Sequence, residues 1–150
     1  MCLLKVDNDK KISNKIDKAR GLLLQSLHLY CASLDSADVD IFLSLWTSDA
    51  YLDFSERFKG TPKDFIKSVT TKRDKNSYMN HKLGEVEIDL DEGLMTARSV
   101  SGVIATVKTS SSDGYGARRI FGTYIDRWEF EDKWLIDHRI FKRDRQIALA

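Results

Sequence analysis

The chain divides into a first half with helical periodicity and a second half with strand periodicity, and this order constrains the fold most. Apolar residues recur at spacings of three and four over residues 12–34, which predicts one long amphipathic helix. The stretch "DSAD" interrupts the pattern, and a new apolar stripe over residues 39–46 predicts a second, short helix. A third helix is expected from Pro62 to about Thr71, with Thr61 as its cap.

From His81 onward the sequence consists of runs of β-branched and aromatic residues, separated by turn signals. The turns are "DEG" at residues 91–93, "SSSDGYG" at 110–116 and "EDK" at 131–133. They delimit four long strands in a meander. Helices followed by antiparallel strands indicate an α+β fold, with the helices gathered on one face of a curved sheet.

Length and charge exclude several classes of function. A chain of 150 residues fits a single domain, 1–150, with a core over about 12–143 and short polar tails. With 24 basic and 23 acidic residues the net charge is +1, so no global field attracts nucleic acid or an anionic membrane. A small, neutral partner is expected. The sequence shows no signal peptide and no membrane-length apolar run, so a cytoplasmic location is expected.

Metals and disulfides are not expected. His28, His81 and His138 show no ligand spacing, and the two cysteines, Cys2 and Cys31, do not cluster. Cys2 lies at the terminus and Cys31 within a predicted helix, so both are expected to be free thiols.

Four segments together resemble a known family. They are "YxxxxD" from Tyr30, "LWTSDAYLDF" from Leu45, "NHKLGEVEID" from Asn80 and "YxDRWxFxDxWxIxxR" from Tyr124. In this order they resemble the SnoaL-like branch of the nuclear transport factor 2 superfamily, over roughly residues 22–143. The resemblance implies a cone-like fold, with three helices on a strongly curved, mixed, mostly antiparallel sheet that encloses a pocket. It also implies chemistry without a cofactor.

Within this branch, the sequence is most similar in arrangement to bile-acid dehydratases and scytalone dehydratase. Their sites use a helix tyrosine, an aspartate at the end of that helix and a histidine at the start of the following long strand. The matching positions here are Tyr30, Asp35 and His81, which the resemblance therefore implies as catalytic. The match is incomplete, because those enzymes place a further ionisable residue on the next strand, where this chain has Ser99, Ser101 and Thr106.

Each of these three residues also has an ordinary structural explanation. Tyr30 lies on the apolar stripe and fits a core ring whose hydroxyl is bonded to backbone. Asp35 fits an exposed helix end or a cap for the next helix, although the helix dipole disfavours a carboxylate at a helix C-terminus. Strict alternation would place His81 on the polar strand face, and only a bulge at Gly84 would turn it inward with Val86.

The pocket wall is expected to contain aromatic side chains. Some come from the predicted second helix and the strand after it, and others from the last two strands. Tyr51 or Phe54 matches the position where scytalone dehydratase has a tyrosine that helps to hold a water. The residues expected to contact substrate are Phe42, Trp46, Tyr51, Phe54, Tyr124 and His138.

Two functions remain open at this point. The first is a cofactor-free dehydratase or isomerase, in which the His81–Asp35 pair is a general base and Tyr30 donates to a carbonyl oxygen. Its substrate would be a hydrophobic polycyclic, steroid-like or polyketide-like carbonyl compound. The alternative is a binding or assembly module like a ring-hydroxylating dioxygenase small subunit. A homodimer or higher homo-oligomer through the sheet is expected, with Trp128 and Phe130 as candidate interface aromatics.

Overall fold

The structure is a computed structural model that describes residues 2–109 and 116–149, with side chains from Lys5 onward. The serine-rich turn expected at 110–116 lies almost wholly outside the described residues, as does the side chain of Cys2. The other cysteine, Cys31, is a buried free thiol.

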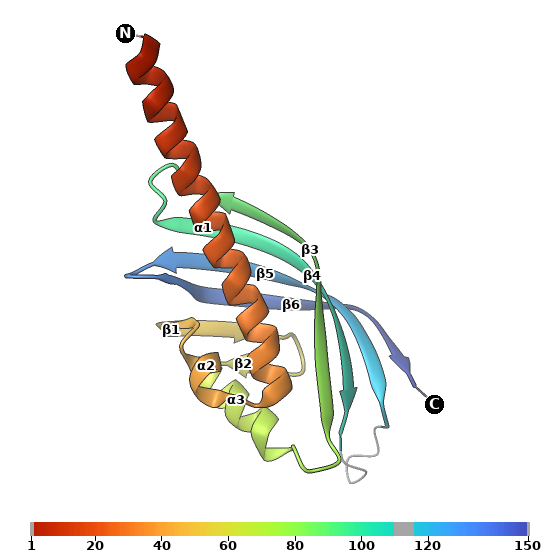
Figure 1. Cartoon of the computed structure of the whole chain (residues 1–150). Coiled ribbons are helices and arrows are strands. Elements are labelled where there is room, and N and C mark those ends of the chain that lie inside the picture. The colour runs from red at the N-terminus through yellow and green to blue at the C-terminus, as the bar shows by residue number, and fades with distance from the viewer. Residues whose placement is uncertain (1, 110–115, 150) are drawn as a thin grey trace.

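Three helices occupy the first half of the chain, as the periodicity predicts. They are α1 (Cys2–Ser36), α2 (Val39–Leu43) and α3 (Pro62–Thr71) (Figure 1). Asp38 caps α2 by accepting a hydrogen bond from the Ile41 amide at 3.0 Å. Thr61 caps α3 as expected, and its hydroxyl accepts from the Asp64 amide at 3.2 Å. The first helix is longer than expected, because it begins at Cys2 and includes the segment predicted as a polar tail.

A single six-stranded sheet makes up the rest of the fold. The strands are β1 (Trp46–Asp53), β2 (Lys59–Gly60), β3 (Tyr78–Leu90), β4 (Thr96–Lys108), β5 (Arg118–Phe130) and β6 (Trp134–Ala148). Their order is β2-β1-β6-β5-β4-β3, with β1 parallel to β6 and all other pairs antiparallel. The predicted meander of four long strands and the α+β class are confirmed.

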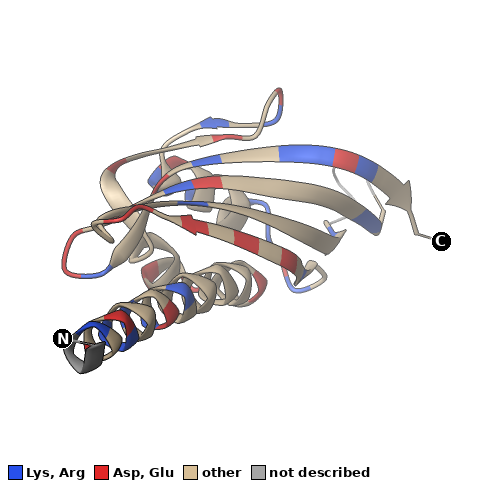
Figure 2. Cartoon of the chain, turned by 90° about the horizontal axis from the view of Figure 1, so that it is seen from above, with Lys and Arg blue, Asp and Glu red and all other residues tan. Residues whose placement is uncertain are grey.

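The sheet bends strongly and stays open at its edges, while the helices lie against one face of it (Figures 1 and 2). α1 crosses this face next to β3, and its N-terminal turns extend beyond the sheet. Lys, Arg, Asp and Glu alternate along that extension in Figure 2, as in a solvated helix. The concave side of the sheet therefore faces α1, α2 and α3.

The core fills the space between the helices and the concave face. Its largest fully buried side chains belong to α1, α2 and the central strands, namely Leu23, Leu27, Tyr30, Phe42, Leu52, Trp128, Ile136 and Arg139. Trp128 is fully buried and its indole N–H donates to Ser99 at 2.9 Å, so its predicted role at a subunit interface is wrong. Phe130 is 37% exposed and packs edge-on against Trp134.

A buried glycine on β5 makes room for an aromatic ring of the next strand. A Cβ atom added at Gly122 would lie within 3 Å of the ring of Phe141 and of the Lys142 carbonyl oxygen. Gly21 on α1 is exposed and has open space around it.

We expect Gly122→Ala to lower the free energy of unfolding by about 1–3 kcal/mol through overpacking. The control Gly21→Ala should raise it by about 0.5–1 kcal/mol through better helix propensity. Urea unfolding of both variants tests this, and equal effects would contradict it.

Candidate functional site

A bulge in β3 turns His81 toward the helices. The pairing with β4 shifts between Leu83 and Val86, so β3 carries one residue more than its partner at Gly84. A Cβ at Gly84 would contact the Gly102 carbonyl oxygen at 3.4 Å, so the two backbones approach closely there. The sequence left two placements of His81 open, and the bulge selects the inward one. It places Met79, His81 and Leu83 on the same face as Val86 and Ile88.

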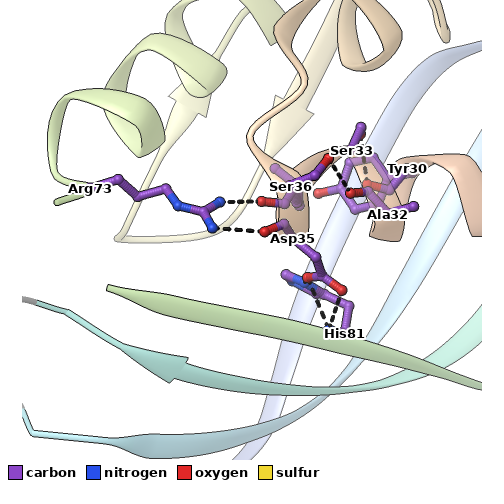
Figure 3. Close-up of polar contacts among 8 residues, drawn as sticks. Tyr30, Ala32, Ser33, Asp35, Ser36, Arg73 and His81 are labelled. Carbon is purple, nitrogen blue, oxygen red and sulfur yellow. Dashed lines mark hydrogen bonds and ion pairs between the residues drawn. The ribbon is translucent and has the colours of Figure 1, made fainter. Parts of the chain in front are cut away.

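The His81 ring makes a close contact with the Asp35 carboxylate across the gap between β3 and α1 (Figure 3). His81 Nδ1 lies 2.7 Å from Asp35 Oδ1, and the His81 backbone N–H donates to both carboxylate oxygens at 3.0 Å. The side chains are 8% and 22% exposed, respectively. When the Asp35 carboxylate is ionised it only accepts hydrogen bonds, so the proton of this contact is on Nδ1, and in the neutral imidazole Nε2 has the lone pair. No described residue forms a hydrogen bond with Nε2.

Arg73, which follows α3, holds the C-terminus of α1 in place. Its guanidinium donates to the Leu34 carbonyl at 2.5 Å and to the Asp35 carbonyl at 2.7 Å (Figure 3). These bonds satisfy two carbonyls at the helix end, and the positive charge offsets the negative end of the helix dipole. This explains how a carboxylate is tolerated in the last turn. Arg73 has no signal in the sequence, because its partner Asp35 lies 38 residues away and no local pattern links the two.

An open cavity of about 280 Å³ lies next to the dyad. Its wall includes both Tyr30 and His81, whereas Asp35 is not part of the wall and contacts His81 from α1. The rest of the wall is mainly apolar and comes from the end of α1, from α3, from the loop after β1 and from the long strands. Its apolar members include Leu34, Phe54, Phe58, Phe65, Val69, Met79, Ala105, Val107, Ile120 and Phe141.

Tyr30 forms the inner end of this cavity and has an unusual electrostatic environment. The Arg139 guanidinium carbon lies 4.0 Å from the centres of both the Tyr30 ring and the Tyr124 ring. The Tyr30 hydroxyl is fully buried, and no described residue makes a well-formed hydrogen bond with it. Burial raises the Tyr30 pKa to about 12, although the nearby Arg139 charge opposes this shift. Tyr30 is therefore a neutral donor at physiological pH.

The raised Tyr30 pKa predicts a pH dependence of stability. In the unfolded chain the tyrosine ionises near its ordinary pKa of 10.0, while the folded one resists ionisation up to about 12. The contribution to stability is therefore complete below pH 10 and is lost as the pH rises to about 12. In Tyr30→Phe, we expect the fall in unfolding free energy over this window to be shallower by about 1 kcal/mol per pH unit. Urea unfolding between pH 8 and 11.5 measures both slopes, and identical slopes would contradict the prediction.

Other residues expected in the pocket wall are divided between two places. Phe54 and Tyr124 line the cavity. Phe42 and Trp46 lie in the core behind it, where both rings pack against Tyr30 at 5.6 and 5.9 Å between centroids.

Tyr51 and His138 do not reach the cavity. Their rings stack on each other at 6.0 Å, and Tyr51 is 42% exposed. The expectation that they line the pocket is therefore wrong. The pairing of β5 with β6 shifts at Asp137, so His138 pairs with exposed Arg127 while Ile136 stays buried. A bulge at Asp137 has no glycine to mark it in the sequence.

Another cavity of about 320 Å³ lies at the opposite end of β3 and β4, lined by residues such as Asp89, Thr96, Arg98 and Glu129. Neither Asp35 nor His81 borders it. The described residues contain no group of three or more His, Cys, Asp or Glu side chains placed to hold a metal ion. No helix in the described part of the chain has the length and apolar character needed to cross a membrane.

A sequence model of the SnoaL-like domain matches residues 18–140, which is most of the chain. The search of curated protein sequences finds no match. The match runs from the middle of α1 into the first half of β6 and includes both members of the His81–Asp35 dyad.

Solved structures with the same fold include proteins of different kinds. A candidate scytalone dehydratase from Novosphingobium aromaticivorans superposes with a TM-score of 0.77 at 16% identity, over 94% of this chain and 92% of that chain. The hexachlorocyclohexane dehydrochlorinase LinA-type3 from Novosphingobium barchaimii gives 0.76 at 14% identity, over 89% and 91%. The β subunit of a candidate aromatic-ring-hydroxylating dioxygenase from Novosphingobium aromaticivorans gives 0.67 at 15% identity, over 90% and 94%. At these identities the similarity shows the fold alone.

Proposed function

The chain belongs to the SnoaL-like domain family, and from this premise we propose that it is a cofactor-free general acid/base enzyme, a dehydratase or an isomerase. The observation that carries the proposal is the 2.7 Å contact between His81 Nδ1 and Asp35, in a dyad whose imidazole borders an apolar cavity. A paired imidazole at such a cavity is suited to removing a proton from a carbon atom. The solved structures with this fold support the class through the names of two members, a candidate scytalone dehydratase and a dehydrochlorinase.

The proposed chemistry needs a substrate with an acidic C–H bond next to a carbonyl group. His81 Nε2 takes the proton, the C–H electron pair forms an enolate, and Asp35 stabilises the resulting imidazolium. Tyr30, a neutral donor, donates a hydrogen bond to the oxygen where the negative charge develops. Return of the proton from Nε2 to a β-hydroxyl expels water, and its return to another carbon gives an isomer. The apolar wall suits polycyclic, steroid-like or polyketide-like compounds.

The first experiment measures proton exchange rather than a complete reaction. Polycyclic ketones and β-hydroxy ketones are incubated with the protein in D₂O, and NMR follows both loss of the α-proton signal and release of water as an enone forms. We expect exchange with at least one compound class at a rate well above that of buffer alone. Absence of exchange and of water loss across steroid-like and polyketide-like ketones would count against the enzyme.

A second candidate function is a subunit-assembly module. The observation that favours it is a pair of exposed apolar side chains on the sheet face opposite the helices, Val100 at 42% and Ile104 at 40% exposed. The dioxygenase β subunit with the same fold agrees with it. A homodimer through this face is also part of the proposal. Sedimentation of the parent and of Val100→Glu tests whether this face forms a homodimer. A dimer that uses this face should dissociate in the variant.

A further inference from the structure

Four basic side chains are gathered around the cavity next to the dyad. Arg57, Lys72, Arg118 and Arg143 all contribute to its wall. They come from four different segments, namely the loop before β2, the end of α3, the start of β5 and the second half of β6. Within residues 2–109 and 116–149, no aspartate or glutamate lines this cavity. A chain with a net charge of only +1 therefore concentrates one sign of charge at its apolar cavity.

Of these four residues, Arg143 gives the most direct evidence that the cavity binds an anion. It pairs with Gly122 across β6 and β5, on the inner face of the sheet, and it is half-buried. Its Nε and Nη2 atoms are both buried, and no described residue accepts a hydrogen bond from either atom. A buried guanidinium normally finds a carboxylate or another acceptor, because its desolvation is costly. Two buried donors of one guanidinium also match the two oxygens of a bidentate anion.

The neighbouring wall defines the rest of the ligand. Phe54 and Phe141 pack against each other at 5.4 Å between centroids, and both line the cavity beside Arg143. The centroid of the Tyr124 ring lies 5.3 Å from that of the Phe141 ring, on the inner side. The cavity therefore offers aromatic surface and buried cationic donors within one space.

We propose that the cavity selects an amphipathic anion, an apolar ring compound whose carboxylate or similar oxyanion binds Arg143. The inference deepens the proposed function and rests on it for the statement that this ligand is the substrate. The anionic ligand takes the place of the neutral partner that was expected from the net charge of the chain. Carboxylate, sulfonate and phosphate share the required chemistry of a charged group with several acceptor oxygens.

Two fluorescent probes that differ by one group test the selection. 8-Anilinonaphthalene-1-sulfonate carries a sulfonate, and N-phenyl-1-naphthylamine has the same aromatic body without it. We expect Arg143→Gln to weaken binding of the sulfonate probe roughly tenfold and to change binding of the neutral probe less than twofold. Raising the salt concentration from 50 to 500 mM should likewise weaken only the sulfonate probe. Competition with a steroid carboxylate and a steroid phosphate ester ranks the two kinds of oxyanion.

Arg145→Gln is the matched control. It lies two residues further along β6 and pairs with Phe121 on the outer face, because the strand pairing shifts between Phe121 and Gly122. It should leave binding of both probes unchanged. Lys72→Gln provides a second test from the opposite wall, independent of whether Arg143→Gln folds, and should weaken the sulfonate probe severalfold.

The inference would be overturned if Arg143→Gln weakened binding of both probes equally. It would also be overturned if Arg143→Gln and Arg145→Gln weakened binding of the sulfonate probe equally. Because the readout is binding, its failure differs from failure of the enzyme. Proton exchange on ketones without any anion preference would overturn only the selection of anions. Anion preference that depends on Arg143, without exchange on any ketone, would support the selection and count against the enzyme.

Discussion

His81→Gln is expected to lower the rate of substrate deprotonation by about 10²- to 10⁴-fold, because glutamine cannot accept a proton at neutral pH. Asp35→Asn should fall within the same range. It removes the charge that lies 2.7 Å from His81 Nδ1, which stabilises the imidazolium and fixes the tautomer with the proton on Nδ1. Proton exchange on the best ketone from the screen measures both effects. The double variant should be little worse than either single variant, because the two residues act as one unit.

His28→Gln is the control for this experiment. His28 is an exposed residue on the same helix as Asp35, and it does not border the cavity. The rate of proton exchange with His28→Gln should stay within twofold of the rate with the parent protein. Thermal unfolding separates loss of chemistry from loss of fold, because Asp35 also accepts the His81 backbone N–H. Full activity in either dyad variant would disprove the assignment of the base.

Asp126→Asn is expected to lower the free energy of unfolding by about 3–5 kcal/mol. Asp126 and Arg139 form a completely buried ion pair, with bonds of 2.7 Å from Arg139 Nε and 2.8 Å from Nη2. The coulombic attraction and hydrogen bonds of Asp126 raise the Arg139 pKa despite its burial. Arg139 stays charged when Asp126 is neutralised, so the variant leaves an unpaired cation beneath the Tyr30 and Tyr124 rings. Urea unfolding with a constant m-value measures the loss.

The neighbouring pair Arg127–Asp137 supplies a matched control on the same two strands. It is also bidentate, but the Arg127 side chain is 59% exposed. Asp137 is only 11% exposed and loses its partner in Arg127→Gln, so this variant should cost about 1–2 kcal/mol, still less than Asp126→Asn. Replacing the buried pair together, in Asp126→Leu with Arg139→Met, should recover most of the loss caused by Asp126→Asn. Similar losses in Asp126→Asn and Arg127→Gln would contradict the importance of burial.

Much of the architecture could be predicted from the sequence, because it depends on short-range patterns. The spacings of three and four over residues 12–34 predicted the middle and end of α1, and the Thr61–Pro62 start predicted α3. Gly84 within a strand pattern marked the position where a bulge would turn His81 inward, and the structure has the bulge there. The family resemblance singled out Asp35 and His81 as partners, and the structure brings their side chains together.

Other features were decided only by tertiary structure. The bulge at Asp137 moves His138 away from the cavity, and no residue near it signals a register shift.

What the sequence by itself determined is the order of helices and strands, the cap of α3 and the strand faces up to the first bulge, because these depend on neighbours within one or two turns of chain. The tertiary structure alone decided that Arg73 holds the end of α1 and that Arg143 lies in the cavity wall. Arginine side chains are long, and their partners come from segments far away in sequence. Their roles depend on where the bent sheet and the helices meet, which no local pattern encodes.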